Sequence, residues 1–256
     1  MDATFSPQRS NTDEESTLSR AKHVEKHKGY GYLMRDCIIG FADGITVPFA
    51  LTAGLSSLGQ SKLVVLGGLA ELFAGSISMG LGAWLAAVTE KQHYELEEAR
   101  EWREVREKPT EEEEEIFDLF AEYGVDRQAA RSVVTALKAN EDQWVRFMMD
   151  FELKLEKPAI KTACVEGLVM GVSYFIGGLF PLVPYFAFPH NTLHGLFTSI
   201  AVTGMVLLLF GFTKARLIGT SWKAAFAGAI QMLIVGSVAA AVAYGIVRAV
   251  DSNRNL

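Results

Sequence analysis

The segment LVVLGGLAELFAGSISMGLGAWLAAV (Leu63–Val88) runs directly into TEKQHYELEEAREWREVREK (Thr89–Lys108). The first part is apolar and long enough to cross a membrane, whereas the second is highly charged and contains no proline or glycine. We therefore predict one helix over Leu63–Glu107, which at 1.5 Å per residue is roughly 68 Å long. That is twice the thickness of the hydrocarbon layer, so half of the helix would lie in lipid and half in water.

The rest of the chain repeats the apolar pattern. Half of the 256 residues are hydrophobic, and several windows of twenty or more residues are almost free of charge, which is typical of transmembrane helices. The sequence therefore predicts an all-α membrane protein with five transmembrane helices. The predicted spans are Leu33–Ser57, Leu63–Val88, Pro158–Tyr185, Thr192–Phe212 and Ala224–Val247.

The charge is concentrated between the second and third spans. Residues 90–157 hold 20 acidic and 11 basic side chains, so this segment carries −9 while the whole chain carries −6. An acidic insert argues against a nucleic acid as partner. Pro109 should end the first helix of the insert, Thr110 and Glu113 match a capping box for the next, and Gly124 should end that one. Further helices with an apolar face should follow.

These features divide the chain into five parts. A polar tail over residues 1–29 is expected to be disordered, residues 30–88 hold spans one and two, and residues 89–157 form a helical, metal-binding insert. Residues 158–249 hold spans three to five, and residues 250–256 form a short tail. Lysine and arginine gather before span one and between spans four and five, which places the N-terminus and the insert in the cytosol and the C-terminus on the other side.

Ionisable and soft side chains lie inside the apolar spans. Asp43 and Glu71 each lie roughly a third of the way along a span, and ionisable groups at such positions usually face a cavity or a partner. Met79 follows Glu71 by eight residues on the same helix face, which suggests a cation path, although most methionines in spans only pack. Asp36 and Glu166 are weaker candidates near the ends of spans. Pro48 should kink or break the first span just after Asp43.

Glutamates at helical spacing mark the insert. Glu97, Glu101 and Glu104 share one face of the first helix, and Glu112 and Glu115 share a face of the next. Two such faces opposite each other would make an oxygen-rich metal site, while the alternative is a solvated helix start. Glu90 and His93 form a single ExxH element, whereas a di-iron bundle needs two.

Together these motifs resemble the vacuolar iron transporter family. The resemblance rests on R-D-x-x-x-G-x-x-D-G-x-x-x-P (Arg35–Pro48), E-x-x-x-G-S-x-S-M-G (Glu71–Gly80) and the Glu-rich insert. It implies a homodimeric, proton-coupled exporter of Fe²⁺ from cytosol to vacuole, with Asp43, Glu71 and Met79 along a path at the dimer axis. The metal ligands implied in the insert are Glu101, Glu104, Glu112, Glu115, Met148 and Glu152, with Met149 as an alternative to Met148.

The expected protein is thus a secondary active transporter and not an enzyme. Fe²⁺ is its expected substrate, with Zn²⁺, Co²⁺ and Mn²⁺ possible, and no permanently bound cofactor is expected. Its expected partners are the ion, protons, the membrane and a second copy of the chain, for which the GxxxG pairs at Gly40/Gly44 and Gly167/Gly171 are further signals. The alternatives are a Mn²⁺ exporter, a membrane-anchored ferroxidase and a metal-sensing adaptor.

Overall fold

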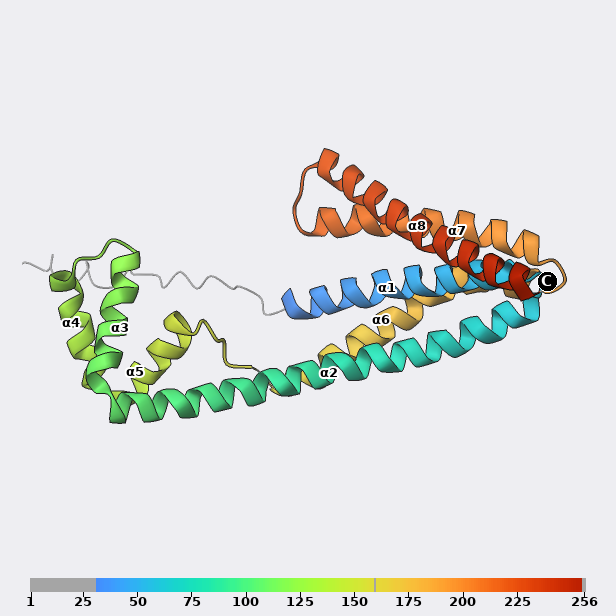
Figure 1. The fold of residues 1–256 in the computed structure, drawn as a ribbon. Helices are drawn as coiled ribbons and strands as arrows, with labels where there is room; N and C mark the ends of the chain where they lie inside the picture. The colour runs from blue at the N-terminus through green and yellow to red at the C-terminus, as the bar shows by residue number, and fades with distance from the viewer. Residues whose placement is uncertain (1–30, 159, 255–256) are drawn as a thin grey trace, which may run out of the picture. The chain divides into compact units, whose positions relative to one another are not determined.

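The structure, a computed structural model, describes residues 31–158 and 160–254, and it contains no strand in those ranges. The all-α prediction is confirmed, while the predicted disordered tail (1–29) lies outside the described residues. The helices, shown in Figure 1, are α1 (Gly31–Ser56), α2 (Ser61–Glu107), α3 (Pro109–Glu122), α4 (Arg127–Lys138), α5 (Glu141–Phe147), a π-helical turn η1 (Met148–Glu152), α6 (Ile160–Ala187), α7 (Thr192–Leu217) and α8 (Trp222–Arg254).

Five of these helices, α1, α2, α6, α7 and α8, are long and apolar enough to cross a membrane. They coincide with the five predicted spans and begin within a few residues of the predicted starts. The fifth helix is longer than predicted, since α8 continues to Arg254 and takes in most of the expected tail at residues 250–256.

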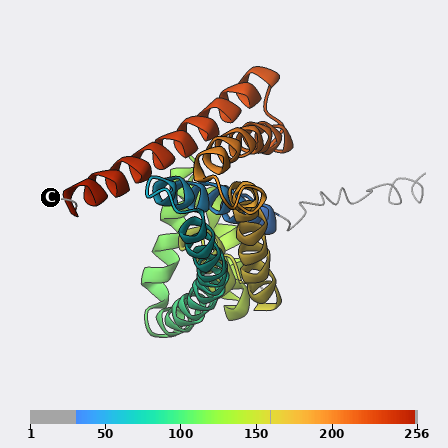
Figure 2. The same ribbon diagram turned by 90° about the vertical axis from the view of Figure 1, so that its right-hand side faces the viewer.

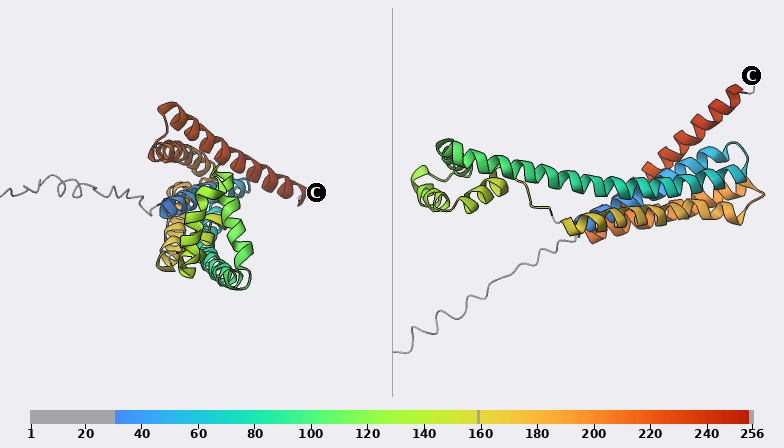
Figure 3. Two further views of the ribbon diagram at one scale, coloured as in Figure 1. Left: turned by 90° about the vertical axis from the view of Figure 1, so that its left-hand side faces the viewer. Right: turned by 90° about the horizontal axis from the view of Figure 1, so that it is seen from below.

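α2 is the continuous helix that the opening segment predicts. It covers 47 residues without interruption, and Figures 1 and 3 show it passing from the apolar helices to the helices of the insert (residues 89–157). It ends at Glu107 because Pro109 has no backbone N–H to donate to the preceding turn. One continuous helix therefore carries both the apolar and the charged parts of this sequence.

Small residues bring the membrane helices together within the chain. A Cβ placed on Gly40 or Gly44 of α1 would collide with the backbone of Met170 or Tyr174 of α6. On the other side of α6, the backbone at Gly167 and Gly171 lies against α2, and Figure 2 shows α2 beside α6. Both GxxxG pairs are thus occupied by contacts within one chain, so they give no support to a dimer.

The first span does not break at its proline. α1 continues through Pro48 to Ser56, so the helix does not break after Asp43, one of the two predicted outcomes, while the predicted kink stays a prediction. The proline ring is buried and lies beside Gly178 of α6, which leaves room for it. Because proline has no N–H, the carbonyl one turn before it loses its hydrogen-bond donor. Membrane helices tolerate proline since neighbouring helices can satisfy that carbonyl.

Polar contacts join two turns at one end of these helices. The Ser56 and Tyr185 hydroxyls lie 2.7 Å apart, and those of Ser61 and Thr192 are also 2.7 Å apart. These contacts tie the α1–α2 turn to the α6–α7 turn. The insert is attached to the other end of α2, so the five membrane helices separate these two turns from the insert.

The insert has its own apolar core. Trp144, Met148 and Met149 are buried there together with Ile116 and Phe117 of α3. The predicted capping box does not form, because Pro109 takes the first helical position of α3 and Lys108 becomes its N-cap. Gly124, with φ +73°, follows the end of α3 as predicted. Two apolar residues that recur at helical spacing in the insert, Val133 and Phe151, are exposed and do not belong to this core.

Candidate functional site

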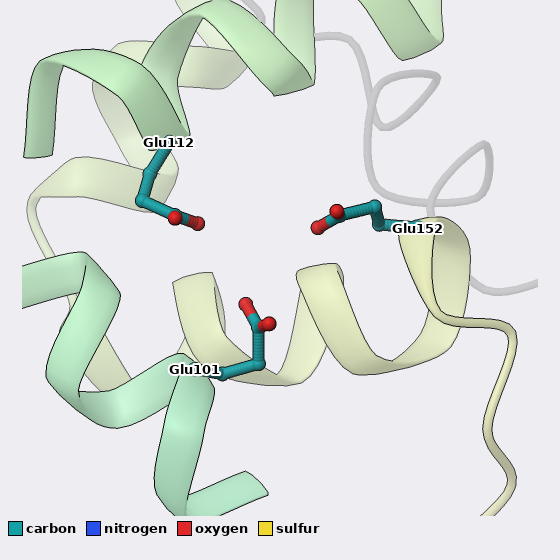
Figure 4. A group of neighbouring side chains, drawn as sticks. All are labelled: Glu101, Glu112 and Glu152. Carbon is teal, nitrogen blue, oxygen red and sulfur yellow. The ribbon is translucent and has the colours of Figure 1, made fainter. Parts of the chain in front are cut away.

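Three glutamates from three different helices converge in the insert. Glu101 comes from α2, Glu112 from α3 and Glu152 from η1, and one carboxylate oxygen of each lies within 4.8 Å of the others. Figure 4 shows the three carboxyl groups pointing toward one another. We call Glu101, Glu112 and Glu152 the insert triad.

Local helix geometry explains this convergence. Glu101 shares the buried face of α2 with Tyr94 and Val105, at helical spacings of seven and four residues. Glu112 lies one turn before the buried Ile116 on α3. The same apolar contacts that hold the insert together therefore turn these carboxyl groups inward.

The surroundings of the triad are unfavourable for free carboxylates. Glu101 and Glu112 are only 3% and 4% exposed, and one oxygen of each triad member is buried without a hydrogen-bond partner among the described residues. Burial, followed by the charges of Glu115 and the other cluster glutamates, raises the pKa of Glu112 to about 8 and that of Glu152 to about 7. When deprotonated, these carboxylates repel one another, and a bound cation would offset that repulsion. Carboxylate oxygens suit a hard or borderline divalent ion.

The other predicted insert ligands are placed differently. Glu104 is half-buried and accepts a hydrogen bond from Arg100 at 3.1 Å. Glu115 is exposed, but it is close enough to Glu152 to form a side-chain hydrogen bond and to raise the pKa of that residue. Glu97 lies near His93 and Arg100 instead.

Met148 and Met149 are both completely buried in the core of the insert. They begin the π-helical turn that ends at Glu152. Their burial is equal, so it does not choose between them as ligands. The structure thus brings the carboxylate oxygens of the insert triad close together. The roles of Glu104, Glu115 and the two methionines as ligands stay predictions.

Glu71 has a hydrogen-bond partner on a neighbouring membrane helix. It is half-buried on α2, and one of its oxygens accepts a hydrogen bond from the hydroxyl of Tyr174 on α6. Its other oxygen is buried and has no hydrogen-bond partner in the described part of the chain. The residue therefore keeps one oxygen available for a cation or a proton.

Sequence reasoning missed Tyr174. Gly75, one turn after Glu71, allows the contact, because a Cβ there would lie 2.6 Å from the Tyr174 ring. The available signal was Gly75, four residues after Glu71, because a glycine on that helix face leaves room for a large side chain from a neighbouring helix.

The remaining membrane candidates do not gather around Glu71 through direct contacts. Asp43 is exposed on α1 and makes no hydrogen bond or ion pair with any described residue. Met79 and Glu166 are half-buried. Asp36 is buried and pairs with Arg35 at 3.1 Å, so its charge is already matched.

Known proteins resemble this chain over most of its length. A profile of the VIT family matches residues 34–248. Vacuolar iron transporter 1 of Oryza sativa subsp. japonica is 44% identical over 241 residues, covering 94% of each chain. Vacuolar iron transporter 1 of Arabidopsis thaliana is 40% identical over 90% of each chain. Protein CCC1 of Saccharomyces cerevisiae is 38% identical over 84% of this chain and 68% of its own. These relatives indicate a transporter and not an enzyme.

Proposed function

The chain belongs to the VIT family of vacuolar iron transporters, and we propose that it moves Fe²⁺ from the cytosol into the vacuole in exchange for protons. Fe²⁺ is the substrate of this reaction. Five apolar helices and the names of the relatives support a multi-pass protein of the vacuolar membrane. The proposed orientation places the N-terminus and the insert in the cytosol and the C-terminus in the lumen, as the lysine and arginine distribution favours.

The observation that carries the proposal is the insert triad. Three carboxylates with buried, unpartnered oxygens lie close together with no cationic side chain to neutralise them among the described ion pairs. In the proposed mechanism, the triad captures Fe²⁺ from the cytosol. Glu104, Glu115 and Met148 would complete the ligand set, with Met149 as the alternative sulfur ligand.

Glu71 would receive the ion in the membrane. Its free oxygen supplies one ligand, Met79 on the same helix adds a thioether that suits a borderline ion, and Asp43 supplies a second carboxylate. Asp43 is exposed in the single chain. An exposed carboxylate in lipid needs a partner, so we propose that α1 of a second copy covers it in a homodimer.

Protons would release the ion at the far side. A carboxylate binds a metal ion only when it is deprotonated, so the ion and a proton compete for the same oxygen. At an acidic lumenal face, protonation of Glu71 or Asp43 would weaken the site, and the bound proton would then leave toward the cytosol as the site reloads. Metal and protons would thus move in opposite directions.

Uptake of Fe²⁺ by proteoliposomes with an imposed pH gradient tests the proposal. Uptake into vesicles with an acidic interior should exceed uptake without a gradient, and it should fall when an ionophore removes the gradient. An equal rate of Fe²⁺ uptake with and without the pH gradient would contradict proton exchange. Addition of Mn²⁺ in the same assay distinguishes the proposed Fe²⁺ transporter from a Mn²⁺ exporter by which ion is favoured.

A further inference from the structure

A group of cations lies where α7 turns into α8. Lys214 and Arg216 are in the last turns of α7, and Lys223 is at the start of α8. None of the three forms an ion pair with a described residue. The sequence explains this, since Glu166 is the only acidic residue between Pro158 and Val250. We call Lys214, Arg216, Trp222 and Lys223 the basic corner.

Several cations elsewhere in the chain have carboxylate partners. In the insert, Arg106 pairs with Glu141 at 3.3 Å, and Lys138 pairs with Glu113. The basic corner differs because the described protein offers it no anion. Its charge must be balanced from outside the chain.

Arg216 is held in a fixed position. Its guanidinium carbon lies 4.7 Å from the centre of the Trp222 ring, and one of its N–H groups donates to the Thr220 carbonyl at 2.6 Å. The Thr220 hydroxyl in turn donates to the Ala215 carbonyl at 2.8 Å. A guanidinium has five N–H donors, so most of them remain available in a side chain that is already oriented.

Apolar side chains surround these cations. Trp222 is 63% exposed and its ring packs beside that of Phe212, while Leu217 and Ile218 are each 65% exposed. Exposed aromatic and aliphatic groups next to lysine and arginine are typical of the boundary between lipid and water. A soluble anion would not account for this apolar border, whereas a lipid accounts for both features.

We propose that the basic corner binds the phosphate headgroup of an anionic phospholipid in the leaflet that faces the insert. Arg216 and Lys223 contact the phosphate, Lys214 adds positive charge, and Trp222 lies along the start of the acyl chains. This inference rests on the membrane helices and not on metal transport. Bound lipid would fix the α7–α8 turn at the surface of the bilayer.

The test uses the purified full-length chain reconstituted in phosphatidylcholine vesicles that contain a minor fraction of phosphatidylserine. After mild solubilisation, native mass spectrometry counts the lipids that remain bound. We expect phosphatidylserine to be retained in preference to phosphatidylcholine. The double variant Arg216→Gln/Lys223→Gln should lose this preference by about 25-fold, at about fivefold for each of the two removed charges.

Arg103→Gln/Arg131→Gln is the matched control, because both arginines are exposed in the insert and neither has an ion pair among the described residues. This control should retain phosphatidylserine as the wild type does. Trp222→Ala keeps every charge and should weaken retention less than the double variant. Lys223→Gln alone, with a smaller expected loss, keeps the test valid should the double variant fail to insert.

Two results would overturn the proposal. The first is equal retention of phosphatidylserine and phosphatidylcholine by the wild type. The second is displacement of phosphatidylserine by inorganic phosphate at low concentration, which would assign the corner to a soluble anion.

Discussion

The insert triad and the membrane carboxylates hold negative charge in different surroundings. In the insert, Glu101, Glu112 and Glu152 meet within one chain, and their oxygens lie within 4.8 Å of one another. In the membrane helices, Glu71 has a tyrosine partner and one free oxygen, while Asp43 is exposed and has no hydrogen bond to any described residue. In the proposed mechanism, a single chain would therefore supply most of the collecting site but only part of a path through the membrane.

This difference suggests a division of labour along α2. The helix carries Glu71 in its apolar half and Glu101 in its charged half, so it connects the two sites in one rigid element. The triad is suited to hold an ion, because several buried carboxylates bind a cation together. Glu71 is suited to exchange an ion for a proton, because it offers one open oxygen. The following changes separate these two roles.

The largest effect is expected from Glu71→Gln. The amide keeps the size of the side chain and can still contact Tyr174, but it neither binds a proton nor contributes charge to an ion. Gradient-driven Fe²⁺ uptake by proteoliposomes should fall to the level of empty vesicles. Glu166→Gln, a half-buried carboxyl on α6, is the matched control and should keep most of the activity. Normal uptake by the Glu71 variant would remove this residue from the mechanism.

Loss of a triad carboxylate should mainly affect metal binding. Glu112→Gln removes one of the three triad carboxylates and should weaken binding of Fe²⁺ to the insert by about 100-fold, equivalent to about 3 kcal/mol. Anaerobic equilibrium dialysis of the full-length protein measures this change. The neighbouring Glu111→Gln is the control, since Glu111 is exposed and pairs with Lys108. Equal loss in both variants would show that general acidity, and not the triad, binds the ion.

The triad should also bind metal in a pH-dependent way. Burial raises the pKa of Glu112 to about 8 and of Glu152 to about 7, so both carry protons in slightly acidic solution. An incoming ion must displace these protons, and its affinity should rise by about tenfold or more per pH unit between pH 6 and 7, then level off above pH 8. Dialysis at several pH values checks this trend. A flat profile would mean that the triad is not the binding site.

Tyr174→Phe should have the smallest effect of these changes. The variant keeps the ring that packs on Gly75 and removes only the hydroxyl that donates to Glu71. A hydrogen bond of about 1 kcal/mol corresponds to a several-fold change in uptake, together with a shift in the pH at which uptake is half-maximal. Tyr185→Phe is the control. It removes a buried hydroxyl that contacts Ser56 and not Glu71, so the pH dependence of uptake should stay unchanged.

The sequence predicted the helices well because the relevant signals are local. Apolar length defines the five spans, and the absence of proline between Thr89 and Glu107 predicts the continuous α2. Pro109 illustrates the limit of such rules. Its fixed φ suits the first helical position, and this preference prevailed over the capping box that Thr110 and Glu113 suggested.

The sites were harder to predict because they depend on contacts between helices. A run of five glutamates at positions 111–115 does not reveal that Glu112 turns inward while Glu111 stays in water. That choice follows from how α3 packs on α2 and η1. Tyr174 is 103 residues from Glu71, and an aromatic residue in an apolar span has no local sign of its partner. The GxxxG pairs suggested a dimer but pack within the chain.

The most direct test of the division of labour is Fe²⁺ uptake as a function of Fe²⁺ concentration, in proteoliposomes of wild type, Glu101→Gln/Glu112→Gln and Glu71→Gln. The triad variant should need much more Fe²⁺ for half-maximal uptake but reach a similar maximal rate. The Glu71 variant should show no gradient-driven uptake at any concentration. A triad variant that loses its maximal rate as completely as the Glu71 variant would contradict separate collecting and transporting sites.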